Sequence, residues 1–275
     1  SYYNPYGNQV AGAGLGQDLF FYRRTIEVPR VTRNTNNTFH LDTSLDGDLS
    51  IAGMPWNWSV NSNYSKVSGN VFSTGNINLV NLKKALGPSF MNAAGTVVCG
   101  TPTAIVGGCV PFNILAGPSV DNSAAYGYVM SRGQATYGSV VSSLSADISG
   151  EVYKLPAGAI GLAAGIEHRE VRGNDTPGQF EQSGLSTDLA GNVTVGKYTV
   201  KEVYAELNIP ILKGLPGVDS LVPNVATRHS DYSTYGKTDR SKFSLQWRPI
   251  GDVMVRGTVA EGFRAPTLND ISGGG

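Results

Sequence analysis

The chain has 275 residues, enough for one large domain or two small ones, and its formal net charge is zero. Without an excess of Lys and Arg it lacks the charge that contacts phosphate backbones, which excludes a role in binding nucleic acid. Thirty-five Gly, thirteen Tyr and only 15% charged residues describe strands and turns better than helices. We therefore expect an all-β fold.

The first part of the chain predicts a long loop followed by a hairpin. Residues 1–37 are rich in Tyr, Asn and Gly and show no sustained period. From Thr38 to Leu49 apolar and polar residues alternate, as in a strand with one wet face. After a short turn at 50–55, the alternation resumes at Trp56 and Trp58 and continues to residue 66. The two tryptophans lie where an aromatic girdle at a lipid interface is expected.

The segment from 67 to 134 predicts a second long loop that carries short helices. One helix is expected at Asn78–Leu86, before Gly87 and Pro88, and another at Asp121–Arg132. Between them, Cys99 and Cys109 lie in a stretch rich in Gly and Pro. Their spacing favours a disulfide and thus an oxidising compartment, while two free thiols in a cytosolic protein remain the alternative.

The rest of the chain predicts further strands with one apolar and one polar face. The clearest runs from Ser139 to Tyr153, with Val140, Leu144 and Ile148 on one side. A return strand follows the turn at 155–158, and a polar loop covers 173–196. Further strands are expected at about 202–209, 221–235, 242–248 and 253–260, separated by turns rich in Pro and Gly at 210–217 and 249–252.

The connections alternate between short turns and longer polar loops, so turns and loops lie at opposite ends of the sheet. Outer-membrane barrels show this asymmetry. Strands of ten to fifteen residues exceed the usual five or six of a soluble sandwich, but they fit a tilted strand that crosses a bilayer. We expect the apolar face to contact hydrocarbon and the polar face to line a hydrated lumen.

The end of the chain carries its most specific motif, the run Glu261, Gly262, Phe263, Arg264, Ala265 and Pro266, followed by Thr-Leu-Asn-Asp. This run resembles a signature of TonB-dependent outer-membrane receptors, which import scarce nutrients into Gram-negative bacteria. Residues 99–114, 151–172 and 198–271 are also similar to that family. For the motif itself we favour a structural role that fixes the end of the strand and the following loop.

The resemblance implies a partial antiparallel transmembrane β-barrel, with about eight of the roughly 22 strands of such transporters. The expected organisation is loops at 1–37 and 67–134, barrel strands at 38–66 and 139–271, and no plug domain. The implied partners are the TonB complex through the missing plug, outer-membrane lipid and a small-molecule nutrient, either a siderophore-type iron chelate or a carbohydrate. The alternatives are a passive porin-like channel and a soluble secreted β-protein that binds polysaccharide.

No catalytic or metal site is expected from the sequence, nor a cofactor. The three histidines are far apart, and no nucleophile elbow or phosphate-binding loop is present. The protein is therefore not expected to be an enzyme. The candidates for ligand contact are aromatic residues in the expected outer loops, although packing within those loops explains them as well. These are Tyr2, Tyr3, Tyr6, Tyr126 and Tyr128.

Overall fold

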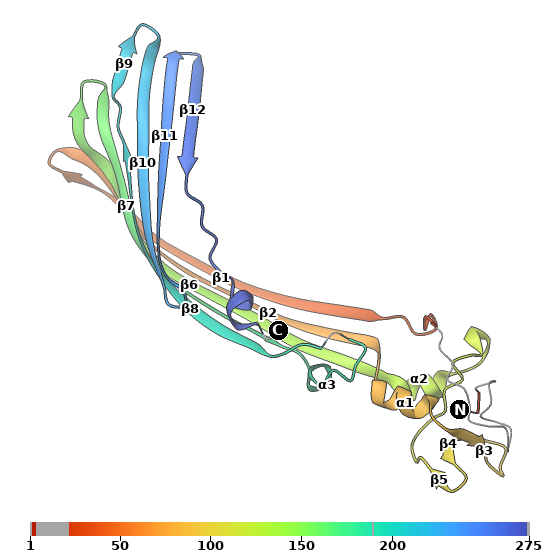
Figure 1. Cartoon of the computed structure of the whole chain (residues 1–275). Coiled ribbons are helices and arrows are strands. Elements are labelled where there is room, and N and C mark those ends of the chain that lie inside the picture. The colour runs from red at the N-terminus through yellow and green to blue at the C-terminus, as the bar shows by residue number, and fades with distance from the viewer. Residues whose placement is uncertain (1, 4–21, 189, 274–275) are drawn as a thin grey trace.

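The computed structural model describes residues 2–3, 22–188 and 190–273. In these residues nine strands form one antiparallel sheet (Figure 1). Eight of them follow in the order β1 (Val31–Ile51), β2 (Met54–Ile77), β6 (Met130–Leu155), β7 (Gly158–Thr176), β8 (Thr194–Asn208), β10 (Val218–Tyr232), β11 (Gly236–Ile250) and β12 (Val253–Ala260). The short β9 (Leu212–Leu215) pairs with β10. The sheet stays open, as expected for part of a barrel.

The two ends of the sheet differ in their connections, as the sequence predicts. Tight turns at 52–53, 156–157, 216–217 and 251–252 lie together at one end (Figure 1). The opposite end carries the loops at 78–129 and 177–193 and a short turn at 233–235. We call these the turn end and the loop end.

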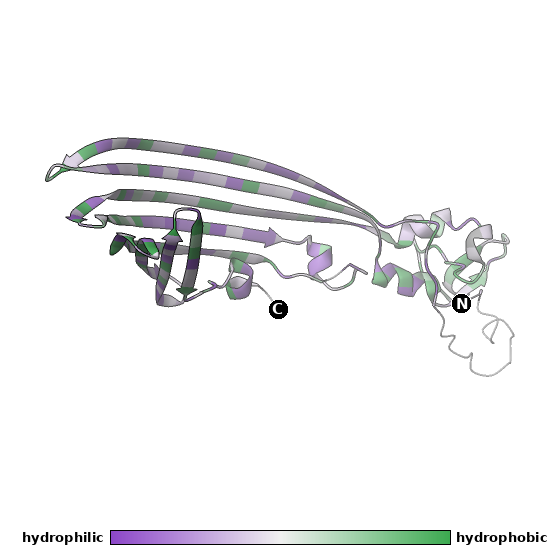
Figure 2. Ribbon diagram, turned by 90° about the horizontal axis from the view of Figure 1, so that it is seen from above, coloured by the Kyte–Doolittle hydropathy of each residue, from purple (hydrophilic) through white to green (hydrophobic). Residues whose placement is uncertain are grey.

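The apolar face of the sheet is not covered by a second layer of the described chain. Leu45, Val60, Ala146, Ile166 and Val203 are direct neighbours across five strands. Leu45 is 66% exposed and Ile166 is 61% exposed. Figure 2 shows the alternation of hydrophobic and hydrophilic residues along the strands. A sandwich would bury these side chains against a second sheet, so this single layer excludes a two-sheet core for the described residues.

Glycines face aromatic rings at several places in the sheet. Trp56 lies opposite Gly150, and Trp58 lies opposite Gly47. A Cβ added to Gly150 would stand 2.4 Å from the Trp56 ring, and one on Gly47 would stand 3.0 Å from the Trp58 ring. The rings therefore lie across the neighbouring strand and pack in the space a side chain would fill.

The loop between β2 and β6 folds into a small module with its own core. It contains α1 (Leu79–Leu86), β3 (Ser89–Met91), β4 (Val97–Thr101), β5 (Ala104–Ile105), a 3₁₀ turn (Gly117–Ser119) and α2 (Ser123–Val129). Asn78 caps α1 by accepting hydrogen bonds from the amides of Val80 and Asn81. Phe112 and Val129 pack between the helices, and a disulfide joins Cys99 to Cys109.

Several elements differ from the sequence prediction. β1 begins at Val31 rather than Thr38, β2 extends to Ile77, and β6 begins at Met130 rather than Ser139. These extensions do not alternate apolar and polar residues, since Val71 and Phe72 are adjacent in a mostly polar stretch, so the periodicity cannot reveal them. α2 ends at Val129 instead of Arg132, and the short strands β3, β4, β5 and β9 and the helices α3 (Gln179–Gln182) and α4 (Leu268–Ser272) were not predicted. No helix in the described part of the chain is both long and apolar enough to span a membrane.

Candidate functional site

The face opposite the apolar rows is a continuous polar surface, which we call the polar wall. Three adjacent register rows cross up to seven strands and form its centre. Each row is given in strand order from β1 to β11. The row nearest the turn end is Asp46, Ser59, Asp147, Gly165, Tyr204, Arg228 and Arg240, and the next is Ser44, Asn61, Ser145, Glu167, Glu202, Ser230 and Thr238. The row nearest the loop end is Asp42, Asn63, Ser143, Arg169, Val200, Tyr232 and Gly236.

A hydrogen bond passes over one strand of the wall. Tyr204 on β8 donates its hydroxyl to Asp147 Oδ1 on β6 at 2.7 Å, and the strand between them presents Gly165. A Cβ on Gly165 would stand 2.4 Å from that same carboxylate oxygen. On the other side, Asn61 donates to Asp147 Oδ2 at 3.4 Å. The side chains of β2, β6 and β8 are thus joined across the wall.

Glu202 is the most buried charged group of the wall, with its side chain 6% exposed. Its Oε2 lies 3.4 Å from a guanidinium nitrogen of Arg169 and 3.4 Å from one of Arg228. Ser230 donates a hydrogen bond of 2.6 Å to Oε1. Both oxygens of this buried carboxylate therefore have polar partners within the wall. Arg228 also lies over the Tyr204 ring, 5.4 Å from its centre.

An aromatic cluster stands at the loop end of the wall. The rings of Tyr232 and Tyr235 stack with centres 4.4 Å apart, and Phe263 packs 6.1 Å from each of them. The guanidinium of Arg240 lies 5.0 Å from the centre of the Phe263 ring. Burial raises the pKa of Tyr235, and the neighbouring Tyr232 adds to the shift. This cluster combines flat apolar faces with a cation, a combination that binds planar organic groups and sugar rings.

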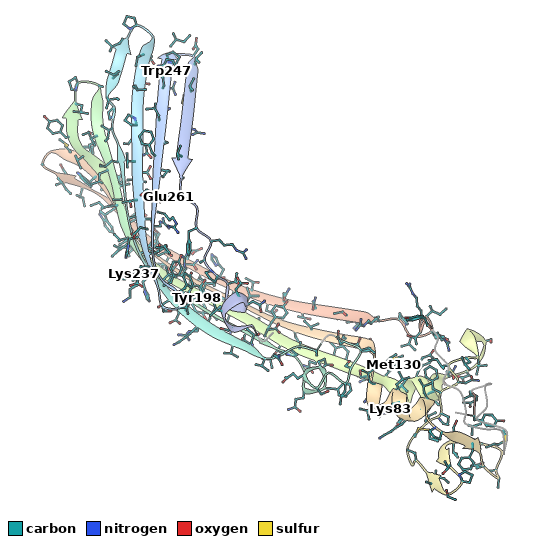
Figure 3. All side chains as sticks on the ribbon, viewed as in Figure 1. Lys83, Met130, Tyr198, Lys237, Trp247 and Glu261 are labelled. Atoms are coloured by element: carbon teal, nitrogen blue, oxygen red, sulfur yellow. A yellow bond between two sulfur atoms is a disulfide. The ribbon has the colours of Figure 1, made fainter. Side chains whose placement is uncertain are left out.

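The motif after β12 reaches this cluster. Glu261 extends the pairing of β11 and β12, because its amide donates to Ser241 O and its carboxylate accepts from the Ser241 amide. Phe263 then turns into the aromatic cluster. Figure 3 shows Glu261 at the end of β12, with Trp247 at the turn end, Lys83 in the module and Met130 at the start of β6 beside it. These contacts agree with the structural role expected for residues 261–266, which stays a proposal.

The segment that follows the motif is seated on the polar wall. A Cβ on Gly173 would stand 2.9 Å from Leu268, and one on Gly196 would stand 2.6 Å from Ser272 Oγ. Asp270 and Thr267 form a capping box at the start of α4. The hydrogen bond from the Thr267 amide holds the pKa of Asp270 below its usual value, with the Thr267 hydroxyl contributing. Two glycines on adjacent strands therefore form the seat for α4.

The described aromatic residues among those predicted for ligand contact lie in or beside the module. Tyr126 is 7% exposed and packs edge-on against Phe112 in the core of the module. Tyr128 is half-buried against the same core. The Tyr2 amide donates to Ser89 Oγ on β3, and the Tyr2 ring contacts Tyr3 edge-on. Tyr6 lies outside the described residues.

The polar wall network was not predicted as a site from the sequence. Its residues appeared only as the wet faces of separate strands, because strand register determines which of them meet. The one sequence signal that could have indicated Asp147 and Tyr204 is Gly165 between them, since a glycine inside a strand marks a close approach.

Comparison with known proteins agrees with this architecture. The family model described as TonB dependent receptor-like, β-barrel, matches residues 1–275. No curated protein and no solved structure matches the chain. This family consists of outer-membrane receptors and transporters of Gram-negative bacteria and is not an enzyme family. The open sheet with one apolar and one polar face therefore belongs to a member of the TonB-dependent receptor β-barrel family.

Proposed function

We propose that this chain forms the barrel wall of a receptor that actively imports a scarce nutrient across the outer membrane. The nutrient is a siderophore-type iron chelate or a carbohydrate, too large or too dilute for diffusion through a porin. Energy comes from the TonB complex, which acts on a plug enclosed by the complete barrel. The described residues form no plug, so the wall contributes the lumen and the capture surface.

The observation that carries this proposal is the arrangement of the polar wall beneath the aromatic cluster. Tyr232, Tyr235, Phe263 and Arg240 present ring faces and a cation at the loop end. Below them, Glu202 and Asp147 are held by partners on neighbouring strands. A solute held at the aromatic cluster would meet a rigid, charged wall next, which suits stepwise capture and release.

The apolar face supports the membrane setting of the proposal. Leu45, Ile166, Val203 and Phe243 are each about half exposed or more. A water-soluble protein would expose a continuous face of this size at a cost of roughly 25 cal/mol for each Å² of apolar surface. Contact with hydrocarbon removes that cost.

The test compares uptake in a strain that lacks the full-length receptor with uptake in a strain that expresses it. Radiolabelled ferric siderophores and labelled oligosaccharides are supplied separately, each with and without a protonophore. We expect one class to accumulate only with the receptor and only when the proton gradient is intact. Uptake that persists with the protonophore would instead indicate a passive channel and would overturn the proposal.

A matched pair of variants tests the aromatic cluster. Phe263→Ala removes a ring from the cluster, whereas Phe243→Ala removes a ring from the apolar face. We expect the first to weaken solute binding about tenfold, as loss of one well-packed aromatic contact does, and the second to leave it unchanged. Equal effects would assign the loss to folding rather than to capture.

A further inference from the structure

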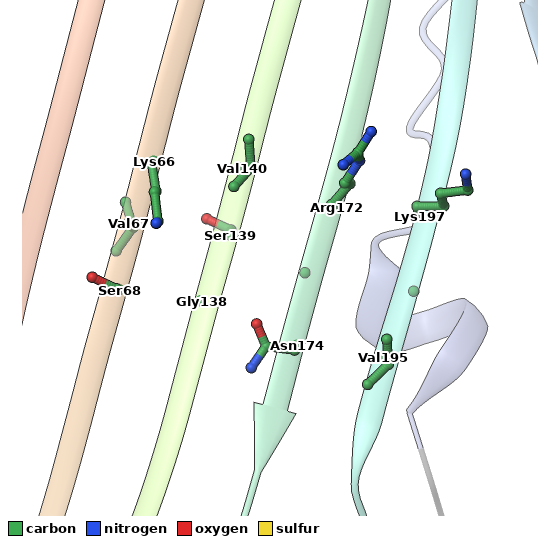
Figure 4. A pocket seen from close by; sticks show the side chains of 12 residues that line it. Lys66, Val67, Ser68, Gly138, Ser139, Val140, Arg172, Asn174, Val195 and Lys197 are labelled. Carbon is green, nitrogen blue, oxygen red and sulfur yellow. The ribbon is translucent and has the colours of Figure 1, made fainter.

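A row of cations crosses the outside of the sheet above the apolar rows. Lys66, Val140, Arg172 and Lys197 are direct register neighbours on β2, β6, β7 and β8. Figure 4 shows these four side chains side by side on the same face. Val140 and Arg172 lie an even number of residues from Leu144 on β6 and from Ile166 on β7, so the row is on the apolar face and points away from the polar wall.

A groove of about 670 Å³ lies beside this row. The next row toward the loop end is Ser68, Gly138, Asn174 and Val195. Gly138 has no side chain, and a Cβ there would stand 3.1 Å from Asn174 Oδ1. The groove thus combines a glycine floor with hydroxyl, amide and cationic groups at its rim.

The charge along the groove is not neutralised within the described chain. Lys66 and Lys197 are exposed and form no salt bridge with any residue that the structure describes. Arg172 bonds to Glu170, yet its side chain remains 61% exposed. Three cations thus face one carboxylate, and the surplus attracts a ligand with several negative charges.

The apolar rows show where this groove lies relative to the lipid. Apart from Val31 at the loop end of β1, the last large apolar residue of this face is Phe39 on β1 but Phe243 on β11, which shares its register row with Leu49. These residues mark the edge of the apolar face, and this edge shifts by ten residues of β1, about 33 Å, between β1 and β11, which are six strand spacings of about 4.8 Å apart. This slope gives a strand tilt of roughly 45°, as in membrane barrels.

The tilt carries the cations progressively away from the hydrocarbon. Lys66 follows Tyr64, where the apolar residues of this face of β2 give way to Lys66, Ser68 and Asn70, with Phe72 lying alone six residues beyond Lys66. Lys197 lies six residues beyond Val203, about 20 Å along β8 and roughly 14 Å above the edge at that tilt. A phospholipid headgroup layer is only about 5–8 Å thick on each side. A lipid that contacts all three cations of the row therefore needs a headgroup thicker than that of a phospholipid.

We propose that this groove binds the phosphate groups of a glycolipid in the outer leaflet, with its acyl chains on the apolar rows. Lysine and arginine hold phosphate through charge-assisted hydrogen bonds, and Asn174 and Ser68 are placed to contact sugar hydroxyls. The inference rests on the membrane location that the proposed function assigns. It adds a lipid site on the outside of the barrel, separate from solute capture inside.

The test uses the full-length receptor purified in detergent and native mass spectrometry. The probes are bisphosphorylated lipid A, a glucosamine disaccharide lipid, and the same lipid after enzymatic removal of its phosphates. The variant Lys66→Ala/Lys197→Ala removes two lysines of the groove, and Lys83→Ala/Lys84→Ala removes two exposed lysines of α1 as a matched control.

We expect the phosphorylated lipid to bind the wild type and the α1 control alike, and the groove variant to bind about tenfold more weakly. The dephosphorylated lipid should bind all three proteins equally weakly. Equal binding of the phosphorylated lipid to all three proteins would overturn the proposal. So would displacement by millimolar inorganic phosphate with no dependence on acyl chains, which would indicate a free-phosphate site.

Membrane insertion is measured separately by the shift in gel mobility between heated and unheated receptor. All three proteins should show this shift. If the receptor inserts but the groove variant binds the lipid as the wild type does, only the proposed lipid site is refuted. If the wild type does not insert, the proposed function fails first.

Discussion

Tyr204 and Asp147 are joined by a hydrogen bond of 2.7 Å although a whole strand separates them. The bond is possible because Gly165, the residue between them, leaves the space above β7 empty. The contact connects β6 to β8 directly and so ties together three strands of the polar wall.

Gly165→Ala should break this contact. The new Cβ would stand 2.4 Å from Asp147 Oδ1 and 2.6 Å from the Tyr204 ring, so both side chains must move apart. We expect a loss of about 1 kcal/mol in the free energy of unfolding, measured by urea denaturation in detergent. Gly257→Ala is the control, because a Cβ there has no neighbour within 4 Å.

A double-mutant cycle separates the hydrogen bond from other effects of Gly165→Ala. Tyr204→Phe removes the hydroxyl and should cost a similar amount. In that background Gly165→Ala should cost clearly less than in the wild type, because the bond is already absent. Additive losses would show that the two residues do not act through a shared contact.

Glu202→Ala should destabilise the wall more than Glu206→Ala does. Glu202 is 6% exposed and has three partners, whereas Glu206 is 40% exposed, accepts a hydrogen bond of 2.7 Å from Asn224 and pairs with Lys242 at 3.5 Å. Because Arg169 and Arg228 are themselves partly exposed, water screens the pair, and we expect about 1–2 kcal/mol for Glu202 and under about 0.5 kcal/mol for Glu206. The same urea titration compares them; equal losses would contradict the burial argument.

Loss of the disulfide should affect the module without affecting the sheet. Replacing Cys99 and Cys109 by Ser opens a loop of sequence separation 10, which costs the module about 2–3 kcal/mol on the chain-entropy model. Limited proteolysis should then cut within residues 89–106 first. The heat-dependent gel shift of the barrel should persist, and its loss would show that the module and the sheet fold as one unit.

An engineered disulfide tests the seat of α4. A Cβ on Gly196 would stand 3.2 Å from the Ser272 Cβ, slightly closer than the roughly 3.5–4.5 Å of natural disulfides, so a small outward shift of α4 would admit the bond. Gly196→Cys with Ser272→Cys should therefore cross-link on mild oxidation, detected by mass spectrometry of the joined peptides. Gly257→Cys with Ser272→Cys should not; if both pairs cross-link equally, α4 is not held on the wall.

Acid should loosen α4. The pKa of Asp270 is lowered in the folded chain, so its contribution to stability is complete above the unfolded value of about 3.9 and is lost as the pH falls through the folded pKa. Hydrogen exchange of residues 267–273, corrected for intrinsic rate, should show less protection at pH 3 than at pH 7. Thr267→Ala should reduce the protection already at pH 7.

The sequence predicts the membrane-facing part of the fold well because one rule governs it. Val140, Leu144 and Ile148 alternate with polar residues, and a strand between lipid and water requires that pattern. Beyond Lys66 apolar and polar residues no longer alternate, so the periodicity does not predict the continuation of β2 over residues 67–77. The outer module was missed for a different reason, since its fold depends on packing around Phe112 rather than on periodicity.

The site could be predicted only in part. The motif at 261–266 is a local string and is visible directly, but its contact with Tyr232 depends on how the chain turns after β12. The Glu202 cluster joins residues 33 and 26 positions away, so it follows from register alone. Register is set by pairing across several strands, which one strand's sequence does not specify.

The long continuation of β2 holds the module far from the apolar part of the sheet. From Tyr64 to Ile77 the strand covers roughly 43 Å at 3.3 Å per residue, and the module stands at its tip. Over this length, a rotation of the strand by about 10° about a point near Tyr64 would move the module by about 7 Å. Any small change in strand direction near Tyr64 would therefore displace the module by several ångströms, so the position of the module depends on how firmly the sheet is held at that point.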